Sequence, residues 1–115
     1  MSEWKVYSNP KCSKCQKTVA KIRAMGVEPV IVEYLKEPPS VREIQGFMKI
    51  SGLKPESFLR KSEDAFSGHE SLNLEDSQAV AEAIHKCPSI MQRPVVIHQG
   101  KAVIARPPEK IEELL

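Results

Sequence analysis

The chain has 115 residues, a formal net charge of +2 and 41% hydrophobic residues, and these are ordinary values for one globular domain with its own core. No apolar run approaches the roughly 20 residues of a membrane-spanning helix, no signal peptide precedes the first predicted strand, and the three cysteines fit reactive or buried thiols better than a disulfide framework. We therefore expect a single cytoplasmic domain over residues 1–115 whose partners include no nucleic acid and no membrane.

The first part of the chain predicts a strand, a helix and a second strand. The strand covers residues 3–7, the helix covers residues 13–25 and ends at Gly26, and the second strand covers residues 30–34. Short connections of this kind give a right-handed crossover with parallel strands, so the fold class is α/β. The apolar residues expected on one face of the helix are Cys15, Val19, Ile22 and Met25.

The middle of the chain is predicted to be mostly helical. Ser40 and Glu43 form a capping box that begins one helix, and Gly52 ends it. The remaining segments are a short helix over residues 56–61 that carries Phe58 and Leu59 inward, an irregular segment over residues 62–73 and a helix over about residues 75–86.

The last part of the chain predicts two antiparallel strands and a helix. The strands cover residues 93–97 and 102–105, with a tight turn at Gln99 and Gly100. Pro107 and Pro108 then open a helix in which we expect Ile111, Leu114 and Leu115 to be packed. This order of elements predicts a thioredoxin-like fold with a helical insertion between its βαβ and ββα halves.

Two of the three cysteines, Cys12 and Cys15, form a C-x-x-C motif in the stretch Asn-Pro-Lys-Cys-Ser-Lys-Cys over residues 9–15. This spacing is typical of thioredoxin-like redox sites. Cys12 lies where the first strand turns into the helix, and there the unpaired N–H groups and the helix dipole favour an anion and lower a thiol's pKa. Lys11 and Lys14 add to that positive field. Cys15 lies one turn inside the helix, so we expect it to be less exposed and to have a higher pKa. The pair is therefore interpreted as an attacking thiol and a resolving thiol.

Two other interpretations of the cysteine pair are less well supported. A zinc site needs two further Cys or His ligands at a suitable spacing, whereas Cys87, His69, His85 and His98 are scattered singly. A structural disulfide is disfavoured in a chain with an odd number of cysteines and no sign of export. We expect Cys87 to be a buried structural thiol, His69 and His98 to lie on the surface, and His85 to suit the end of its helix.

Three arginines are notable for their positions in this layout. Arg60 ends the short helix, Arg93 precedes Pro94 at the start of a strand, and Arg106 follows the last strand. In a thioredoxin-like fold, the proline at that strand is typically cis and faces the redox cysteine, which brings Arg93 beside Cys12. Guanidinium groups suit a tetrahedral oxyanion because they give paired, charge-assisted hydrogen bonds. Position alone also leaves open that these arginines are solvated surface groups, as most arginines are.

The sequence resembles the small glutaredoxin-coupled arsenate reductases and their relatives. The matching segments run in register over almost the whole chain and comprise residues 9–14, 28–34, 35–40, 58–61, 92–96 and 105–107. The resemblance implies that Cys12 is the thiolate that attacks arsenate. It also implies that the oxyanion is held by Arg60, Arg93 and Arg106, with Asn9, Lys11, Lys14 and Pro94 in supporting positions.

The resemblance also implies the partners of the reaction. Arsenate or a similar oxyanion is the expected substrate, glutathione the expected co-substrate, and glutaredoxin or thioredoxin the expected reductant, with no bound cofactor and no metal. The enzyme would be a thiol-dependent oxidoreductase.

The sequence departs from the family pattern at the active-site loop. Ser8 stands where many of these reductases have His, and Cys15 and Gln16 stand where the family usually has Ser and Arg. A cysteine pair at this place resembles the Spx-type regulators, which sense oxidation and bind RNA polymerase but lack the full set of arginines. Three functions therefore stay open: an arsenate reductase, a general disulfide reductase without arsenate activity, and a redox-sensing regulator of the Spx type.

Overall fold

The computed structural model describes residues 3–61, 68–69 and 71–115. The chain forms two compact units, and each is described by itself: the first combines Met1–Glu37 with Arg93–Leu115, and the second is Pro38–Gln92. The single domain predicted over residues 1–115 stays a prediction. No helix within the described ranges is long and apolar enough to cross a membrane.

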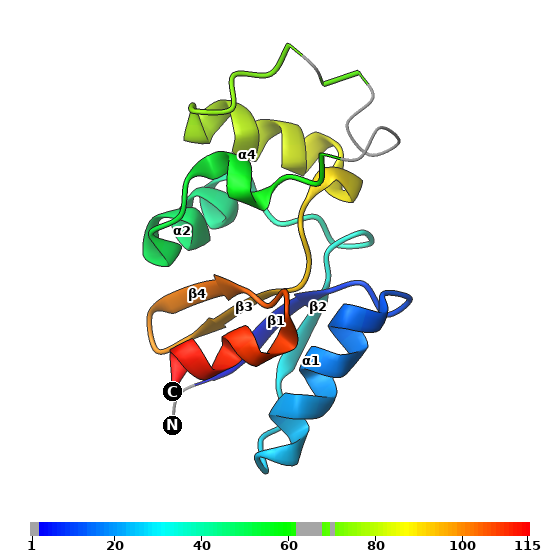
Figure 1. The fold of residues 1–115 in the computed structure, drawn as a ribbon. Helices are drawn as coiled ribbons and strands as arrows, with labels where there is room; N and C mark the ends of the chain where they lie inside the picture. The colour runs from blue at the N-terminus through cyan, green and yellow to red at the C-terminus, as the bar shows by residue number, and fades with distance from the viewer. Residues whose placement is uncertain (1–2, 62–67, 70) are drawn as a thin grey trace. The chain divides into compact units, whose positions relative to one another are not determined.

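The first unit is built on a four-stranded sheet with the strand order β2-β1-β3-β4 (Figure 1). Strand β1 (Lys5–Ser8) pairs in parallel with β2 (Val30–Glu33), and helix α1 (Ser13–Ala24) connects the two. Strand β3 (Val95–His98) pairs antiparallel with β1 and with β4 (Lys101–Ile104). The predicted parallel crossover, the antiparallel hairpin and the α/β, thioredoxin-like order of elements are confirmed.

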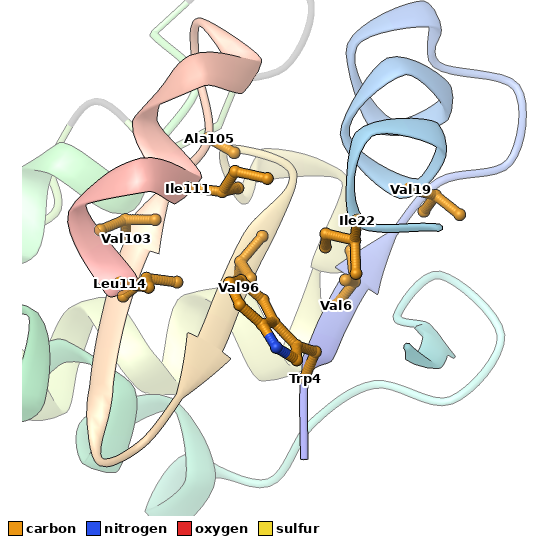
Figure 2. Packing of buried hydrophobic residues seen from close by; sticks show 9 residues of the cluster. All are labelled: Trp4, Val6, Val19, Ile22, Val96, Val103, Ala105, Ile111 and Leu114. Atoms are coloured by element: carbon orange, nitrogen blue, oxygen red, sulfur yellow. The ribbon is translucent and has the colours of Figure 1, made fainter. Parts of the chain in front are cut away.

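One hydrophobic cluster packs α1 and the C-terminal 3-10 helix η3 (Pro108–Leu114) against this sheet (Figure 2). Ile22 of α1, Val96 of β3 and Ile111 of η3 are each 0% exposed. Complete burial of a side chain of this size contributes about 1.5–3 kcal/mol, so the cluster fixes α1, and with it the loop that begins the helix, on the sheet. Its members are Trp4, Val6, Val19, Ile22, Val96, Val103, Ala105, Ile111 and Leu114.

The signals for helix ends and turns act as predicted. The Glu43 N–H donates to the Ser40 hydroxyl at 3.0 Å and the Ser40 N–H donates to the Glu43 carboxylate at 3.4 Å, which is the capping box of α2 (Val41–Ser51). Gly52 ends this helix with a φ of +71°, and Gly26 follows α1 with a φ of +85°. Both angles lie in the left-handed region that glycine adopts without a steric cost.

The second unit contains α2, the 3-10 helices η1 (Pro55–Phe58) and η2 (Pro88–Ile90), and helix α4 (Ser77–Lys86). Helix α2 packs against α4, and the Asp76 carboxylate caps α4 by accepting hydrogen bonds from two N–H groups of its first turn. Phe58 and its neighbour Leu59 are buried, as predicted. Most of the irregular segment predicted over residues 62–73 lies outside the described residues.

The burial predictions for His98, Met25 and Leu115 are wrong. His98 is only 8% exposed because its ring stacks on Trp4, with ring centroids 4.0 Å apart, while its Nδ1 lies 3.1 Å from the Glu3 carbonyl oxygen. Met25 is 40% exposed because it lies beyond the last buried turn of α1. Leu115 is 74% exposed at the chain end. The final helix stands where predicted, but it is a 3-10 helix.

The structure differs from the predicted positions of Cys87 and His69 and agrees with that of His85. Cys87 is half-buried instead of buried, and its Sγ lies 3.4 Å from the Ser89 hydroxyl. His69 is also half-buried. His85 is exposed in the last turn of α4, where it was predicted.

Candidate active site

The Cys12 thiol lies at the N-terminus of α1, as predicted. Cys12 is the N-cap residue, with an extended backbone (φ −90°, ψ 123°), and it is half-buried. Its N–H donates to the Asn9 carbonyl at 2.9 Å, and its own carbonyl accepts from the Gln16 N–H at 3.0 Å. The residue is thus held by a turn of the loop on one side and by the first turn of the helix on the other.

Opposing influences set the pKa of the Cys12 thiol. Burial is the largest of them and raises the pKa, but hydrogen bonds from the N–H and the thiol of Cys15, the N–H of Lys14 and the positive charge of Arg93 together outweigh it. The net effect lowers the pKa of Cys12 from its ordinary value of 9.0 to about 7. A large fraction of Cys12 is therefore thiolate at neutral pH, and the thiolate is the nucleophilic form.

Cys15, in contrast to Cys12, is a fully buried thiol with a raised pKa. It is 0% exposed, and burial, with a smaller contribution from the neighbouring Cys12 charge, raises its pKa to about 11 against hydrogen bonds from Asn9 and Ser8. The Asn9 N–H donates to Cys15 Sγ at 3.4 Å. At neutral pH, the Cys12 thiol is thus largely ionised, while the Cys15 thiol is protonated and enclosed.

Asn9 organises the loop between β1 and α1. In addition to its N–H bond to Cys15, its carbonyl accepts from the Cys12 N–H, and its side-chain Oδ1 accepts from the Lys11 N–H at 3.0 Å. Side chains of this type stabilise tight turns by bonding to main-chain groups two residues on. Asn9 therefore connects the loop to both cysteines of the pair.

Two of the three predicted arginines lie in the same unit as Cys12. Arg93 is half-buried, and its Nε is buried with no hydrogen-bond partner among the described residues. The peptide bond that follows it, Arg93–Pro94, is cis. Arg106 is exposed, and its Nη1 donates to the Arg93 carbonyl at 3.0 Å. Because a buried N–H without an acceptor is unfavourable, the Arg93 Nε is a suitable donor for an anion.

Arg60 belongs to the second unit. Its N–H donates to the Ile90 carbonyl at 2.7 Å, and its Nη1 donates to the Ser89 carbonyl at 3.1 Å. These bonds hold the arginine on the segment that leads out of α4. Its predicted role in binding the oxyanion stays a prediction.

Two cavities border the loop within the first unit. One, of about 440 Å³, is lined in part by Ser8, Pro10 and Gln16, and the other, of about 320 Å³, in part by Ser8, Pro10 and Lys11. Among the residues that the structure describes, no group of three or more His, Cys, Asp or Glu side chains could hold a metal ion.

Known proteins resemble the chain over nearly its whole length. The profile of the ArsC family matches residues 7–114. The chain is 37% identical to an arsenate reductase of Haemophilus influenzae, over 96% of this chain and 97% of that protein, and 37% identical to the protein YfgD of Escherichia coli, over 96% and 95% of the two chains. The solved structure of an arsenate reductase from Vibrio cholerae matches with a TM-score of 0.86 and 32% identity, over 98% of each chain. The chain belongs to the ArsC family.

Proposed function

We propose that this protein is a thiol-dependent arsenate reductase in which Cys12 is the nucleophile. The observation that carries the proposal is the Cys12 thiol at the start of α1, whose pKa is lowered to about 7 in part by Arg93. Arsenate as the substrate is supported by family membership and by relatives that are named arsenate reductases.

The first chemical step is attack of the Cys12 thiolate on the arsenic of arsenate. A sulfur–arsenic bond forms and one arsenate oxygen leaves, protonated to water. Arsenic stays in its pentavalent state in this covalent adduct. The positive groups near Cys12 favour the step because they stabilise both the thiolate and the anion that it must approach.

The second step is the reduction itself. A second thiolate attacks Cys12 Sγ, a disulfide forms, and the electron pair of the sulfur–arsenic bond passes to arsenic, which leaves as trivalent arsenite. We propose Cys15 as this second thiol because it stands three residues from Cys12 and is close enough to hydrogen-bond with it. An intramolecular thiol also acts at a far higher effective concentration than a free one. Thioredoxin or glutaredoxin then reduces the Cys12–Cys15 disulfide by thiol exchange, whereas glutathione would serve as the second thiol wherever Cys15 does not.

We further propose that Arg93, Arg106 and Arg60 bind the oxyanion. For Arg93, support comes from its effect on the Cys12 pKa and from its buried Nε, which has no hydrogen-bond partner in the described part of the chain. For Arg106, it comes from the hydrogen bond to the Arg93 carbonyl. Arg60 is included on the strength of the sequence resemblance.

A second candidate function is general disulfide reduction without arsenate. The contrast between an ionised Cys12 and a protonated, buried Cys15 favours it, because thiol–disulfide exchange needs one attacking and one resolving thiol.

A steady-state assay distinguishes the two functions. The purified protein is given glutathione with glutaredoxin, or thioredoxin with its reductase, and oxidation of the reductant is followed with and without arsenate. Arsenate-dependent oxidation that is lost in Cys12→Ser and kept in Cys87→Ser supports the proposal. Reduction of a model disulfide with no response to arsenate supports the second function and contradicts the first.

A further inference from the structure

The peptide group between Pro10 and Lys11, the second peptide group before Cys12, is held at both ends by side-chain amides. Its N–H, from Lys11, donates to Asn9 Oδ1 at 3.0 Å. Its carbonyl, from Pro10, accepts from the side-chain Nε2 of Gln16 at 2.6 Å. The orientation of this peptide is thus fixed by two side chains, one from the loop and one from α1.

Gln16 contacts the main chain on both sides of Lys11. Its side chain bonds to the carbonyl of Pro10, and its N–H bonds to the carbonyl of Cys12. The main chain of Lys11 and Cys12 is therefore enclosed between two hydrogen bonds from one helical residue. The Asn9 N–H bond to Cys15 Sγ is a further connection between the loop and the first turns of α1.

The position of Cys12 at the helix end contributes to the low pKa of its sulfur. The sulfur benefits from the N–H groups of Lys14 and Cys15, and these are directional donors, so a shift of the Cys12 backbone weakens the bonds to the thiolate. The charged group that faces Cys12 from outside α1 is Arg93, and it does not depend on Gln16.

We propose that Gln16 is a positioning residue for the nucleophile: by clamping the Pro10–Lys11 peptide, its side-chain amide holds Cys12 Sγ over the N–H groups that begin α1. This inference rests on the proposed function in one respect, that Cys12 is the attacking thiol. The proposed effect of Gln16 acts through the main-chain carbonyls of Pro10 and Cys12, to which it donates hydrogen bonds.

The alternative is that Gln16 only adds stability to α1. Gln16 is exposed, and holding a long polar side chain in one conformation costs entropy that its hydrogen bond must offset. A purely stabilising contact changes the melting temperature and leaves the titration of Cys12 where it was. A positioning contact moves that titration.

The experiment measures the rate of alkylation of Cys12 by iodoacetamide against pH, in a Cys15→Ser, Cys87→Ser background where Cys12 is the remaining thiol. Gln16→Met removes the donor at nearly constant side-chain length. Gln16→Asn keeps a neutral amide but is shorter by one methylene group, so it provides a second test if the Met variant folds poorly. Gln78→Met makes the same chemical change at an exposed position of α4 and is the matched control.

We expect both Gln16 variants to raise the midpoint of alkylation from about 7 toward the ordinary cysteine value, and to slow alkylation at pH 7 by about threefold to tenfold, the range for loss of one hydrogen bond. The control should leave both unchanged. An unchanged midpoint in the Gln16 variants, whatever their melting temperature, would overturn the proposal. A midpoint near the ordinary value both in the background protein and in Cys87→Ser, which keeps Cys15, would instead contradict the assignment of Cys12 as a thiolate, on which both proposals depend.

Discussion

Arg106 donates a hydrogen bond from its guanidinium Nη1 to the main-chain carbonyl of Arg93 at 3.0 Å. This bond joins two segments that are separated in sequence by the β3–β4 hairpin. The charge of Arg93 lowers the pKa of Cys12. Arg106 is therefore bonded to a residue that acts directly on the Cys12 thiol. The bond holds the Arg106 guanidinium against the main chain of Arg93, and we propose that this second positive group favours a multiply charged oxyanion.

We predict that Arg93→Ala and Arg106→Ala each weaken binding of arsenate, or of sulfate as an unreactive analogue, by about tenfold or more, the loss expected for a charge-assisted hydrogen bond. Lys at either position should restore binding only in part, because an ammonium group cannot reproduce the paired donors of a guanidinium. Calorimetric titration measures both effects. The same substitutions at Arg60 test the third proposed anion ligand. Wild-type affinity in all of the Ala variants would remove the arginines from the site.

Alkylation against pH should separate the two active-site thiols. Because the Cys12 thiol has a pKa of about 7, its reaction with iodoacetamide should rise through neutral pH and level off above pH 8. The Cys15 thiol, whose pKa is about 11, should stay almost unreactive over that range and gain reactivity only at alkaline pH. The measurement uses Cys15→Ser and Cys12→Ser variants, each with Cys87→Ser. Equal titration of both thiols near the ordinary cysteine value would contradict the assignment of roles.

Replacing Arg93 should also move this titration. Loss of the Arg93 charge removes one influence that lowers the Cys12 pKa, so in Arg93→Gln the alkylation midpoint should shift upward, toward the ordinary value. Arg23→Gln is the control, because the Arg23 guanidinium is paired with Glu28 at 2.8 Å on the exposed surface. Equal shifts in the two variants would show a general charge effect with no specific role for Arg93.

Cys15→Ser should separate the two chemical steps of the proposed reaction. With arsenate and no glutathione, this variant should stop at the Cys12–arsenate adduct and release no arsenite, because the proposed resolving thiol is gone. Addition of glutathione should restore arsenite release through a mixed disulfide on Cys12. Quenched samples analysed by mass spectrometry show each species. Normal arsenite release by Cys15→Ser without any added thiol would mean that Cys15 is not the resolving group.

The stability of the first unit should depend strongly on Ile22. Ile22 is 0% exposed and packs in the cluster that holds α1 on the sheet, so Ile22→Ala should lower the free energy of unfolding by about 2–5 kcal/mol. Met25→Ala, at the exposed end of the same helix, should change it by less than about 1 kcal/mol. Urea unfolding followed by circular dichroism measures both. Similar losses in the two variants would show that α1 is not held by this cluster.

The features predicted correctly from the sequence are those with local causes. The ends of α1 and α2 follow from glycines and from the Ser40–Glu43 capping box, which act within a few residues. Cys12 at the start of α1 follows from the change between strand and helix patterns around it. Arg93 could be placed near Cys12 because the thioredoxin-like order of elements brings the start of β3 next to the loop after β1.

The features that sequence reasoning missed depend on contacts between distant residues. The burial of His98 comes from stacking on Trp4, and no periodic pattern indicates which exposed-looking ring will find such a partner. The bond from Gln16 to Pro10 joins a helix residue to the preceding loop, and a polar residue on the outer face of a helix carries no signal for it. The one available indication was that Gln16 stands where the family usually has Arg.

The most direct test of the account is a single turnover of the unmutated protein with arsenate in the absence of any other thiol, followed by quenching and mass spectrometry. We predict release of one arsenite per chain, loss of the free thiols of Cys12 and Cys15 together, and a decrease of about 2 Da for the two hydrogens removed by the two-electron oxidation. The Cys87 thiol should stay reduced and alkylatable. Absence of both arsenite and a Cys12–arsenate adduct, or arsenite release that leaves Cys12 reduced, would contradict the central claim that Cys12 attacks arsenate.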